Sequence, residues 1–133
     1  MSEIVRDWMT LDVITASSDT TLEEADAILD DEGIRRLAVI DDELLTGVLS
    51  LGDVRAAKAT ASADMTDFSQ QPLVGELMTP DPITIPDTAS LGLAAQTMLQ
   101  LKVSGLPVVG EDGRLCGLLS ASDLFRYSIN TID

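Results

Sequence analysis

Early in the chain, apolar residues recur every three or four positions, as they do on one face of a helix. Thr20 with Glu23 three residues later predicts a capping box at the start of this helix, and Gly33 predicts its end. The apolar face consists of Leu22, Ala25, Ile28 and Leu29. The pattern therefore predicts an amphipathic helix that buries one side.

After this helix the pattern changes to continuous apolar runs, which are typical of buried strands. The runs at 37–40 and 44–50 flank the turn "DDE", so they predict a tight strand pair. A short strand at 13–15 precedes the helix, and a second helix starts beside Ser50. The predicted order is β-α-β-β-α, with helices covering one side of the strands.

The same order is written twice. The segment "VRDWMTLDVIT" (5–15) aligns with "VGELMTPDPIT" (74–84), with six of eleven positions identical. The offset is 69 residues there and 70 residues from Gly47 and Gly117 onward. The second copy predicts a strand at 82–85, a helix at about 90–102 and a strand pair built from "LPVV" and "LCGLLS".

These elements predict the domain organisation. We expect an α+β fold with a first repeat at 1–59, a small polar linker at 60–72 and a second repeat at 73–133. Short apolar segments lead into each repeat, and their large side chains are predicted to pack against the other half rather than to stack on a ligand. These side chains are Trp8, Met9 and Met78.

The chain is strongly acidic, with 8 Lys and Arg against 23 Asp and Glu and a formal net charge of −15. Such a charge repels phosphate backbones and anionic lipid surfaces, so we expect neither nucleic acid nor membrane as a partner. Two interpretations of the charge stay open: solubility alone, or a halophile-like surface adapted to a very salty cytoplasm, where screening reduces self-repulsion.

The sequence contains few residues of the types that usually carry out catalysis. The chain has no histidine and one cysteine, Cys116, whose apolar neighbours predict a small core residue rather than a reactive thiol. The acidic triplets at 30–32 and 41–43 lack the glycine spacing of a calcium loop, so we expect no metal site and no required cofactor. With no histidine and no activated nucleophile, we expect that the protein is not an enzyme. With no signal-like segment and no apolar run of membrane length, we expect it to be cytoplasmic.

The pattern Gly, two apolar residues, Ser, two spacers and Asp occurs in both repeats. Ser50 with Asp53, and Ser120 with Asp123, have the spacing of a helix capping box with Asp at its third position. The same helix start attracts an anion, and an ionised carboxylate suits the vicinal diol of a sugar. The pattern alone leaves both interpretations open.

Six of the eight basic residues flank two landmarks, the start of the middle strand and the motif Asp. In so acidic a chain this distribution suggests a counter-charge for an anionic ligand. Compensation of helix C-termini and surface ion pairs is the alternative explanation. The six residues are Arg35, Arg36, Lys102, Arg55, Lys58 and Arg126.

The duplicated "V-x-(D/E)-x-M-T...IT", "LPVV" and "G-x-x-S-x-x-D" resemble the tandem CBS domain, named after cystathionine beta-synthase. The resemblance covers nearly the whole chain in two copies. It implies two repeats packed sheet to sheet with pseudo-twofold symmetry, two clefts between them and usually a homodimer. Members of this family bind adenine nucleotides or related adenosyl compounds in the clefts, and the bound ligand reports to a partner enzyme, transporter or channel.

The resemblance also implies the ligand-binding residues. Asp53 and Asp123 match the ribose-binding carboxylate, and Ser50 and Ser120 match the hydroxyl near ribose or phosphate. The other residues so implied are Val13, Ile14, Pro82 and Ile83 beside the adenine, Ile34 and Val103 as an apolar wall, and Arg35, Arg36, Ser104, Gly105, Pro107 and Arg126.

The two clefts are expected to differ in their affinity for a ligand. One would combine Asp123 with Arg35 and Arg36, and the other would combine Asp53 with Ser104 and Gly105. Since Gly105 lacks the cation that Arg36 supplies, the first cleft is favoured for a phosphorylated ligand. Ala38 also departs from the family, because it stands where Pro107 and the family have proline.

Two functions of different classes follow. The first is a regulatory module that senses AMP, ADP, ATP or a related adenosyl compound and signals to an unknown partner protein in trans. The second is a ligand-free dimerisation or scaffold module in which the Ser-x-x-Asp motifs only cap helices.

Overall fold

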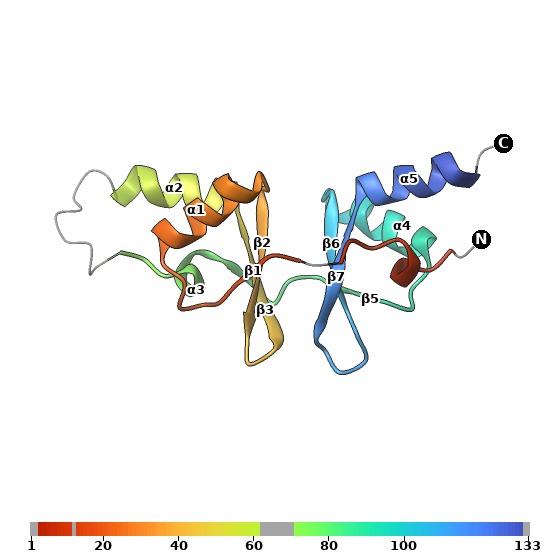
Figure 1. The fold of residues 1–133 in the computed structure, drawn as a ribbon, viewed down its shortest axis with the longest axis horizontal. Coiled ribbons are helices and arrows are strands. Elements are labelled where there is room, and N and C mark those ends of the chain that lie inside the picture. Colours follow the sequence, from red (N-terminus) through yellow and green to blue (C-terminus); the bar gives the residue numbers. More distant parts are fainter. Residues whose placement is uncertain (1–2, 12, 62–70, 132–133) are drawn as a thin grey trace. The chain divides into compact units, whose positions relative to one another are not determined.

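The computed structural model describes residues 3–11, 13–61 and 71–131, which form two compact units. The continuous unit is Ile14–Pro82, and the composite unit joins Met1–Val13 to Ile83–Asp133 (Figure 1). Each unit contains helices and one mixed sheet, so the predicted α+β fold is confirmed.

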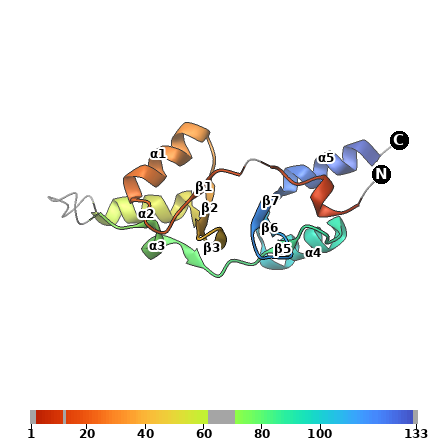
Figure 2. The ribbon, with the colours of Figure 1, turned by 60° about the horizontal axis from the view of Figure 1, so that its bottom comes forward.

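The continuous unit holds a four-stranded sheet in the order β1-β2-β3-β4. β1 runs parallel to β2, and the other neighbours are antiparallel. Helices α1 and α2 lie side by side and enclose buried Leu29, Leu37 and Leu49 against the sheet (Figure 2). The elements are β1 (Thr15–Ala16), α1 (Leu22–Glu32), β2 (Arg36–Asp41), β3 (Leu44–Ser50), α2 (Leu51–Ala61), α3 (Val74–Leu77) and β4 (Thr79–Pro80).

The composite unit repeats this arrangement with a three-stranded sheet in the order β5-β6-β7. β5 is parallel to β6, and β6 is antiparallel to β7. Leu106, Val108 and Leu119 form its core with residues of α4. The elements are the 3-10 helix η1 (Val5–Asp7), β5 (Ile85–Pro86), α4 (Leu91–Leu101), β6 (Gly105–Val109), β7 (Leu115–Ser120) and α5 (Ala121–Thr131).

Helix α1 begins one residue later than the capping prediction. Thr21, not Thr20, is its N-cap: the Thr21 Oγ1 accepts a hydrogen bond from the Glu24 N–H at 3.1 Å. Thr20 instead closes the preceding turn, where its Oγ1 accepts from the Ser17 N–H at 3.0 Å. The predicted end is confirmed, because Gly33 adopts a left-handed φ of 63°.

The leading segments of the two repeats, residues 5–10 and 74–79, lie in exchanged units. Val5 belongs to the first repeat by sequence, yet its side chain is fully buried in the composite unit among second-repeat residues. Val74 is likewise buried in the continuous unit among first-repeat residues. The compact units are therefore cut after Val13 and Pro82, and they differ from the sequence repeats. Most of the predicted linker, residues 62–70, lies outside the described residues.

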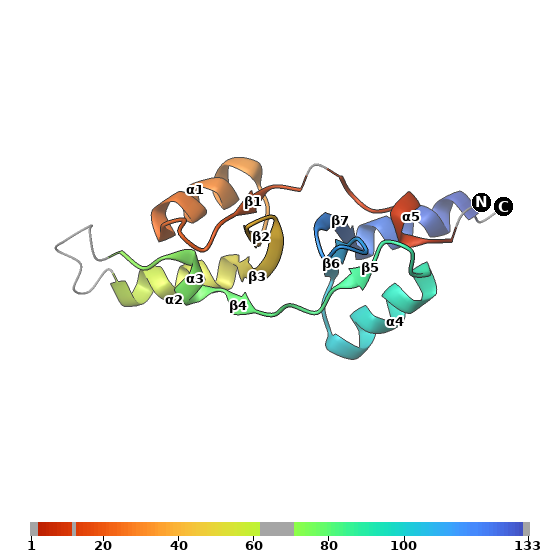
Figure 3. The ribbon, with the colours of Figure 1, turned by 90° about the horizontal axis from the view of Figure 1, so that it is seen from below.

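The exchange is anchored by backbone pairing. Thr10 and Leu118 exchange two backbone hydrogen bonds of 2.8 and 3.0 Å, and β4 pairs with β3 at Gly47 and Val48 (Figure 3). The large side chains pack as predicted: Trp8 and Met9 contact the composite core, and Met78 contacts the continuous core.

The close approach of the leading segments explains why both repeats have glycine at the same position, Gly47 and Gly117. A Cβ at Gly117 would lie 2.6 Å from the Thr10 carbonyl oxygen and 2.9 Å from the Met9 Sδ. A Cβ at Gly47 would likewise collide with Met78 and with the Thr79 carbonyl. Only glycine lets each leading segment approach the strand this closely.

Candidate functional site

Both Ser-x-x-Asp motifs form reciprocal caps. Asp53 Oδ2 accepts a hydrogen bond from the Ser50 N–H at 2.9 Å, and Ser50 Oγ accepts from the Asp53 N–H at 3.0 Å. The corresponding distances for Ser120 and Asp123 are 2.9 and 3.3 Å. The capping interpretation of the motif is confirmed in both copies, and each cap leaves a second carboxylate oxygen for other contacts.

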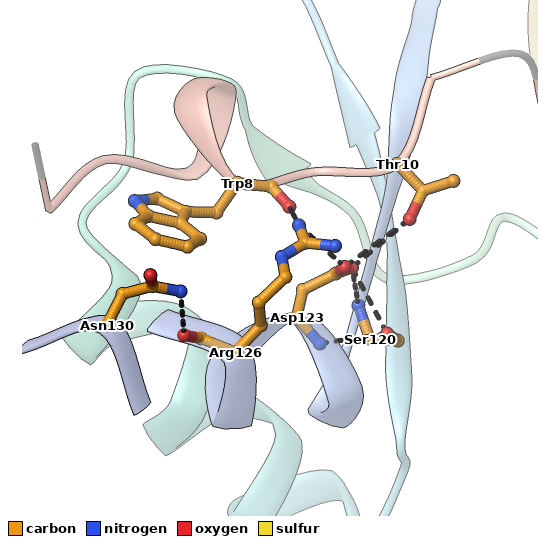
Figure 4. Close-up of polar contacts among 6 residues, drawn as sticks. All are labelled: Trp8, Thr10, Ser120, Asp123, Arg126 and Asn130. Atoms are coloured by element: carbon orange, nitrogen blue, oxygen red, sulfur yellow. Dashed lines mark hydrogen bonds and ion pairs between the residues drawn. The ribbon is translucent and has the colours of Figure 1, made fainter. Parts of the chain in front are cut away.

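In the composite unit that second oxygen is also engaged. Asp123 is 3% exposed, and its Oδ1 forms an ion pair with the Arg126 guanidinium at 3.2 Å. The Thr10 hydroxyl lies 3.4 Å from both carboxylate oxygens. Arg126 also donates to the Trp8 carbonyl at 2.8 Å and stacks its guanidinium 5.7 Å from the indole centre (Figure 4). We call Trp8, Thr10, Asp123 and Arg126 the Asp123 cluster.

Neighbouring side chains complete the packing around the Asp123 cluster. Trp8 contacts Tyr127 edge to face, with ring centres 5.2 Å apart, and Tyr127 donates to the Glu3 carboxylate at 3.0 Å. Burial, and after it the hydrogen bond to Glu3, raises the pKa of the Tyr127 phenol. Asn130 donates to the Arg126 carbonyl at 2.7 Å (Figure 4). The chain's own groups therefore fill the space beside Asp123.

Sequence reasoning did not find Thr10 as a partner of Asp123. The two residues lie 113 positions apart, and only the exchange of leading segments brings them together. Arg126 was predicted to bind a ligand. In the structure it contacts Asp123 and the Trp8 carbonyl, and its role toward a ligand stays a prediction. The repeated "MT" of the leading segments was visible in the sequence, but nothing there indicated its contact.

The surroundings of Asp53 differ from those of Asp123. Among the described residues, no hydrogen bond or ion pair engages the Asp53 Oδ1. Asp53 is half-buried and lines a pocket of about 460 Å³, here called the Asp53 pocket. Its other lining residues are Ala56, Ala57, Thr60, Pro72, Glu76 and Leu77.

Two predicted binding residues, Ile34 and Arg35, line a pocket that is separate from the Asp53 pocket. Ile34 and Arg35 border a pocket of about 360 Å³ between α1 and α2, together with Leu51, Arg55 and Lys58. Asp53 does not line this pocket, because it projects from the other side of α2 from Leu51, Arg55 and Lys58. Lys58 is paired with Asp26 at 2.7 Å.

Two other predicted binding residues, Arg35 and Ser104, directly precede β2 and β6. The Arg35 carbonyl accepts from the Leu51 N–H at 2.8 Å, and the Ser104 carbonyl accepts from the Ala121 N–H at 2.9 Å. These bonds join the residue before β2 to the start of α2, and the residue before β6 to the start of α5. Arg36 pairs with Ser50, and Gly105 with Ser120, in the strand registers. The structure also describes the remaining predicted residues, whose contact with a ligand stays a prediction: Val13, Ile14, Pro82 and Ile83 beside adenine, Val103 as an apolar wall, and Pro107.

Asp41, in the acidic turn, and Cys116 both contact other residues of their own units. Asp41 accepts hydrogen bonds from the Ser18 N–H at 3.0 Å, the Ser18 hydroxyl and the Thr46 hydroxyl. These bonds, the Ser18 N–H first, lower the pKa of the Asp41 carboxyl. Burial raises the pKa of the Cys116 thiol, which packs beside the composite core as predicted.

Two absences in the described residues concern metal ions and membranes. No three metal-binding side chains of the described ranges converge on one point. No helix in the described part of the chain has the length and apolar character needed to cross a membrane.

The comparison with protein families is decisive. The CBS domain model matches residues 5–60 and 74–130. The chain belongs to the CBS domain family. It is 33% identical to a CBS domain-containing protein of Dictyostelium discoideum, over 100% of this chain and 96% of that protein.

Two other CBS relatives place this module in different contexts. The chain is 36% identical to an inosine-5'-monophosphate dehydrogenase of Korarchaeum cryptofilum over 86% of its length, but it spans only 22% of that enzyme. The crystal structure of Arabidopsis thaliana CBSX2 in complex with AMP superposes with a TM-score of 0.85 at 31% identity. That match covers 97% of this chain and 98% of CBSX2 as crystallised.

Proposed function

We propose that this CBS pair is a regulatory module that binds an adenosine nucleotide or related adenosyl compound and signals to a separate partner protein. The observation that carries the proposal is the match to CBSX2, whose structure holds AMP. The match extends over nearly the whole of this chain and of the CBSX2 chain as crystallised, and over 63% of the CBSX2 protein. Both repeats also carry the Ser-x-x-Asp motif that the family uses toward ribose. The module itself performs no reaction in this proposal.

One observation favours the scaffold function as a second candidate. Both motif carboxylates cap their helices, and Asp123 is already saturated by Ser120, Thr10 and Arg126. A ribose at Asp123 would have to replace the Thr10 and Arg126 contacts, whereas a ribose at Asp53 would meet an open oxygen. The Asp53 carboxylate is thus the more open of the two, whereas the resemblance favours the cleft that combines Asp123 with Arg35 and Arg36. Which cleft binds more tightly stays a prediction.

Calorimetric titration tests the two functions against each other. We expect AMP, ADP, ATP or S-adenosylmethionine to release heat and to raise the melting temperature, because a ligand that binds only the folded state stabilises it. Asp53→Ala or Asp123→Ala should weaken the binding of that ligand at least tenfold. Asp19→Ala is the matched control, since Asp19 is an exposed carboxylate with no role in either motif.

Two outcomes would count against the sensor. Absence of heat and of any thermal shift with all four compounds leaves the scaffold function. Binding that survives in both motif variants would place the ligand away from the motif carboxylates.

We also propose that the pair forms a homodimer through α5 and acts in a reducing compartment such as the cytoplasm. Phe125 and Ile129 lie one helical turn apart on α5 and are 66% and 72% exposed, which leaves an apolar stripe without cover in the described chain. Cys116, the only cysteine, is unpaired, as is common in a reducing compartment.

Light scattering measures the dimer directly. The wild-type protein is expected to have twice the mass of the chain, and Phe125→Asp to shift it toward the monomer because a charge is then buried in the interface. Leu44→Asp, at an exposed apolar residue of β3, is the matched control. A monomeric wild type, or equal masses in both variants, would contradict the proposal.

A further inference from the structure

We propose that the Asp53 pocket binds a small, flat organic cation of the guanidinium or amidinium type. The second repeat serves as an internal template for the first. The cation site shares Asp53 with the proposed nucleotide site but rests on neither ribose nor phosphate, so benzamidine binding and nucleotide binding are tested independently.

The repeat alignment pairs the lining of the Asp53 pocket with the surroundings of Asp123. Asp53 corresponds to Asp123, and Ala56 and Ala57 correspond to Arg126 and Tyr127. Leu77 corresponds to Trp8, Thr60 to Asn130 and Pro72 to Glu3. Arg126 and Trp8 belong to the Asp123 cluster, Tyr127 and Asn130 contact these two residues, and Glu3 contacts Tyr127.

The two repeats therefore differ in the side chains that occupy the corresponding space. In the composite unit a guanidinium, an indole and a phenol fill it. In the continuous unit the guanidinium and phenol positions are both alanine and the indole position is leucine, so a pocket of about 460 Å³ is left. The pocket exists because large side chains are absent from these three positions.

The charge of the Asp53 pocket selects a cation. Among the residues that the structure describes, its lining contains the Asp53 and Glu76 carboxylates and no basic residue. Glu76 caps α3 with Oε2, which accepts from the Leu73 N–H at 2.9 Å. In the composite unit the equivalent carboxylate, Asp123, binds a guanidinium through Oδ1, the oxygen that no described residue engages in Asp53.

The shape of the pocket selects a flat body. Ala56, Ala57 and Leu77 give the pocket an apolar lining, and the corresponding Arg126 and Trp8 of the composite unit hold a guanidinium stacked on an indole. A planar cation can donate to the Asp53 carboxylate and lie against this apolar lining at the same time. A phosphate or carboxylate ligand would be repelled by both acids.

Benzamidine is the probe, because it joins an amidinium to a flat ring. We expect it to move the amide resonances of residues 53–57 and 76–77 saturably, with a dissociation constant on the order of 1 mM. Benzamide has the same shape without the charge and should bind at least tenfold more weakly. Resonances that move equally with both compounds, or do not move with benzamidine, would overturn the proposal.

Ala56→Arg places in the pocket the side chain that the second repeat already has there. This exposed helical position tolerates arginine, so the variant should melt no lower than the wild type, while benzamidine binding falls at least tenfold. Ala59→Arg adds the same charge to the same helix outside the pocket lining and should leave binding unchanged. If Ala56→Arg binds benzamidine as the wild type does, the ligand lies elsewhere and the pocket is not its site.

Discussion

Asp123→Ala is expected to lower the free energy of unfolding by about 2–3 kcal/mol, more than the same change at Asp53. The variant loses a helix cap, the Thr10 contact and the partner of Arg126. Because the Arg126 side chain is 55% exposed, water replaces part of the lost ion pair, which keeps the effect below that of a fully buried pair. Urea unfolding measures the difference.

Asp53→Ala is the matched comparison for this effect. It removes the same cap from α2 but no ion pair within the described chain, so we expect a loss of about 1 kcal/mol. Asp123→Asn keeps the shape and one acceptor oxygen and should fall between the two. Equal losses for the two alanine variants would mean that the Thr10 and Arg126 contacts contribute nothing to stability.

Val5→Ala is expected to lower the free energy of unfolding by about 2 kcal/mol and to loosen the composite unit selectively. The Val5 side chain is fully buried with Ile85, Leu91 and Leu119, and its N–H donates to the Ala89 carbonyl at 2.9 Å. Hydrogen exchange should therefore show lost protection in α4 and β6, although Val5 is part of the first repeat by sequence.

Val74→Ala provides the reciprocal test. Val74 is fully buried in the continuous unit, and its N–H donates to the Thr20 carbonyl at 2.8 Å. Its variant should lose protection in α1 and β2 instead. If Val5→Ala loosened α1 and Val74→Ala loosened α4, the leading segments would not be exchanged between the units.

The predictable part of the fold came from local patterns. Helix α1, the strand pair β2 and β3, and their second copies follow from apolar spacing and turn residues that act within a few positions of each other. The one misplaced cap, Thr20 for Thr21, shows the limit of such patterns. Two adjacent threonines offer the same hydroxyl, and the choice depends on the turn at Ser17.

The candidate site was only half predictable. The Ser-x-x-Asp caps are local and were visible in the sequence, whereas the Thr10 contact to Asp123 depends on a segment more than a hundred positions away. The pocket that Ile34 and Arg35 line was equally hidden, because it depends on how α1 and α2 pack against each other.

By itself, the sequence determined the duplication, the order of elements in each copy and the CBS resemblance, since these are properties of spacing along the chain. The tertiary structure alone decided which copy each leading segment completes and which of two identical motifs keeps an open carboxylate oxygen. The physical reason is that burial and pairing are set by side chains far apart in sequence. Arginine and tryptophan fill the space beside Asp123, while alanine and leucine leave it empty beside Asp53.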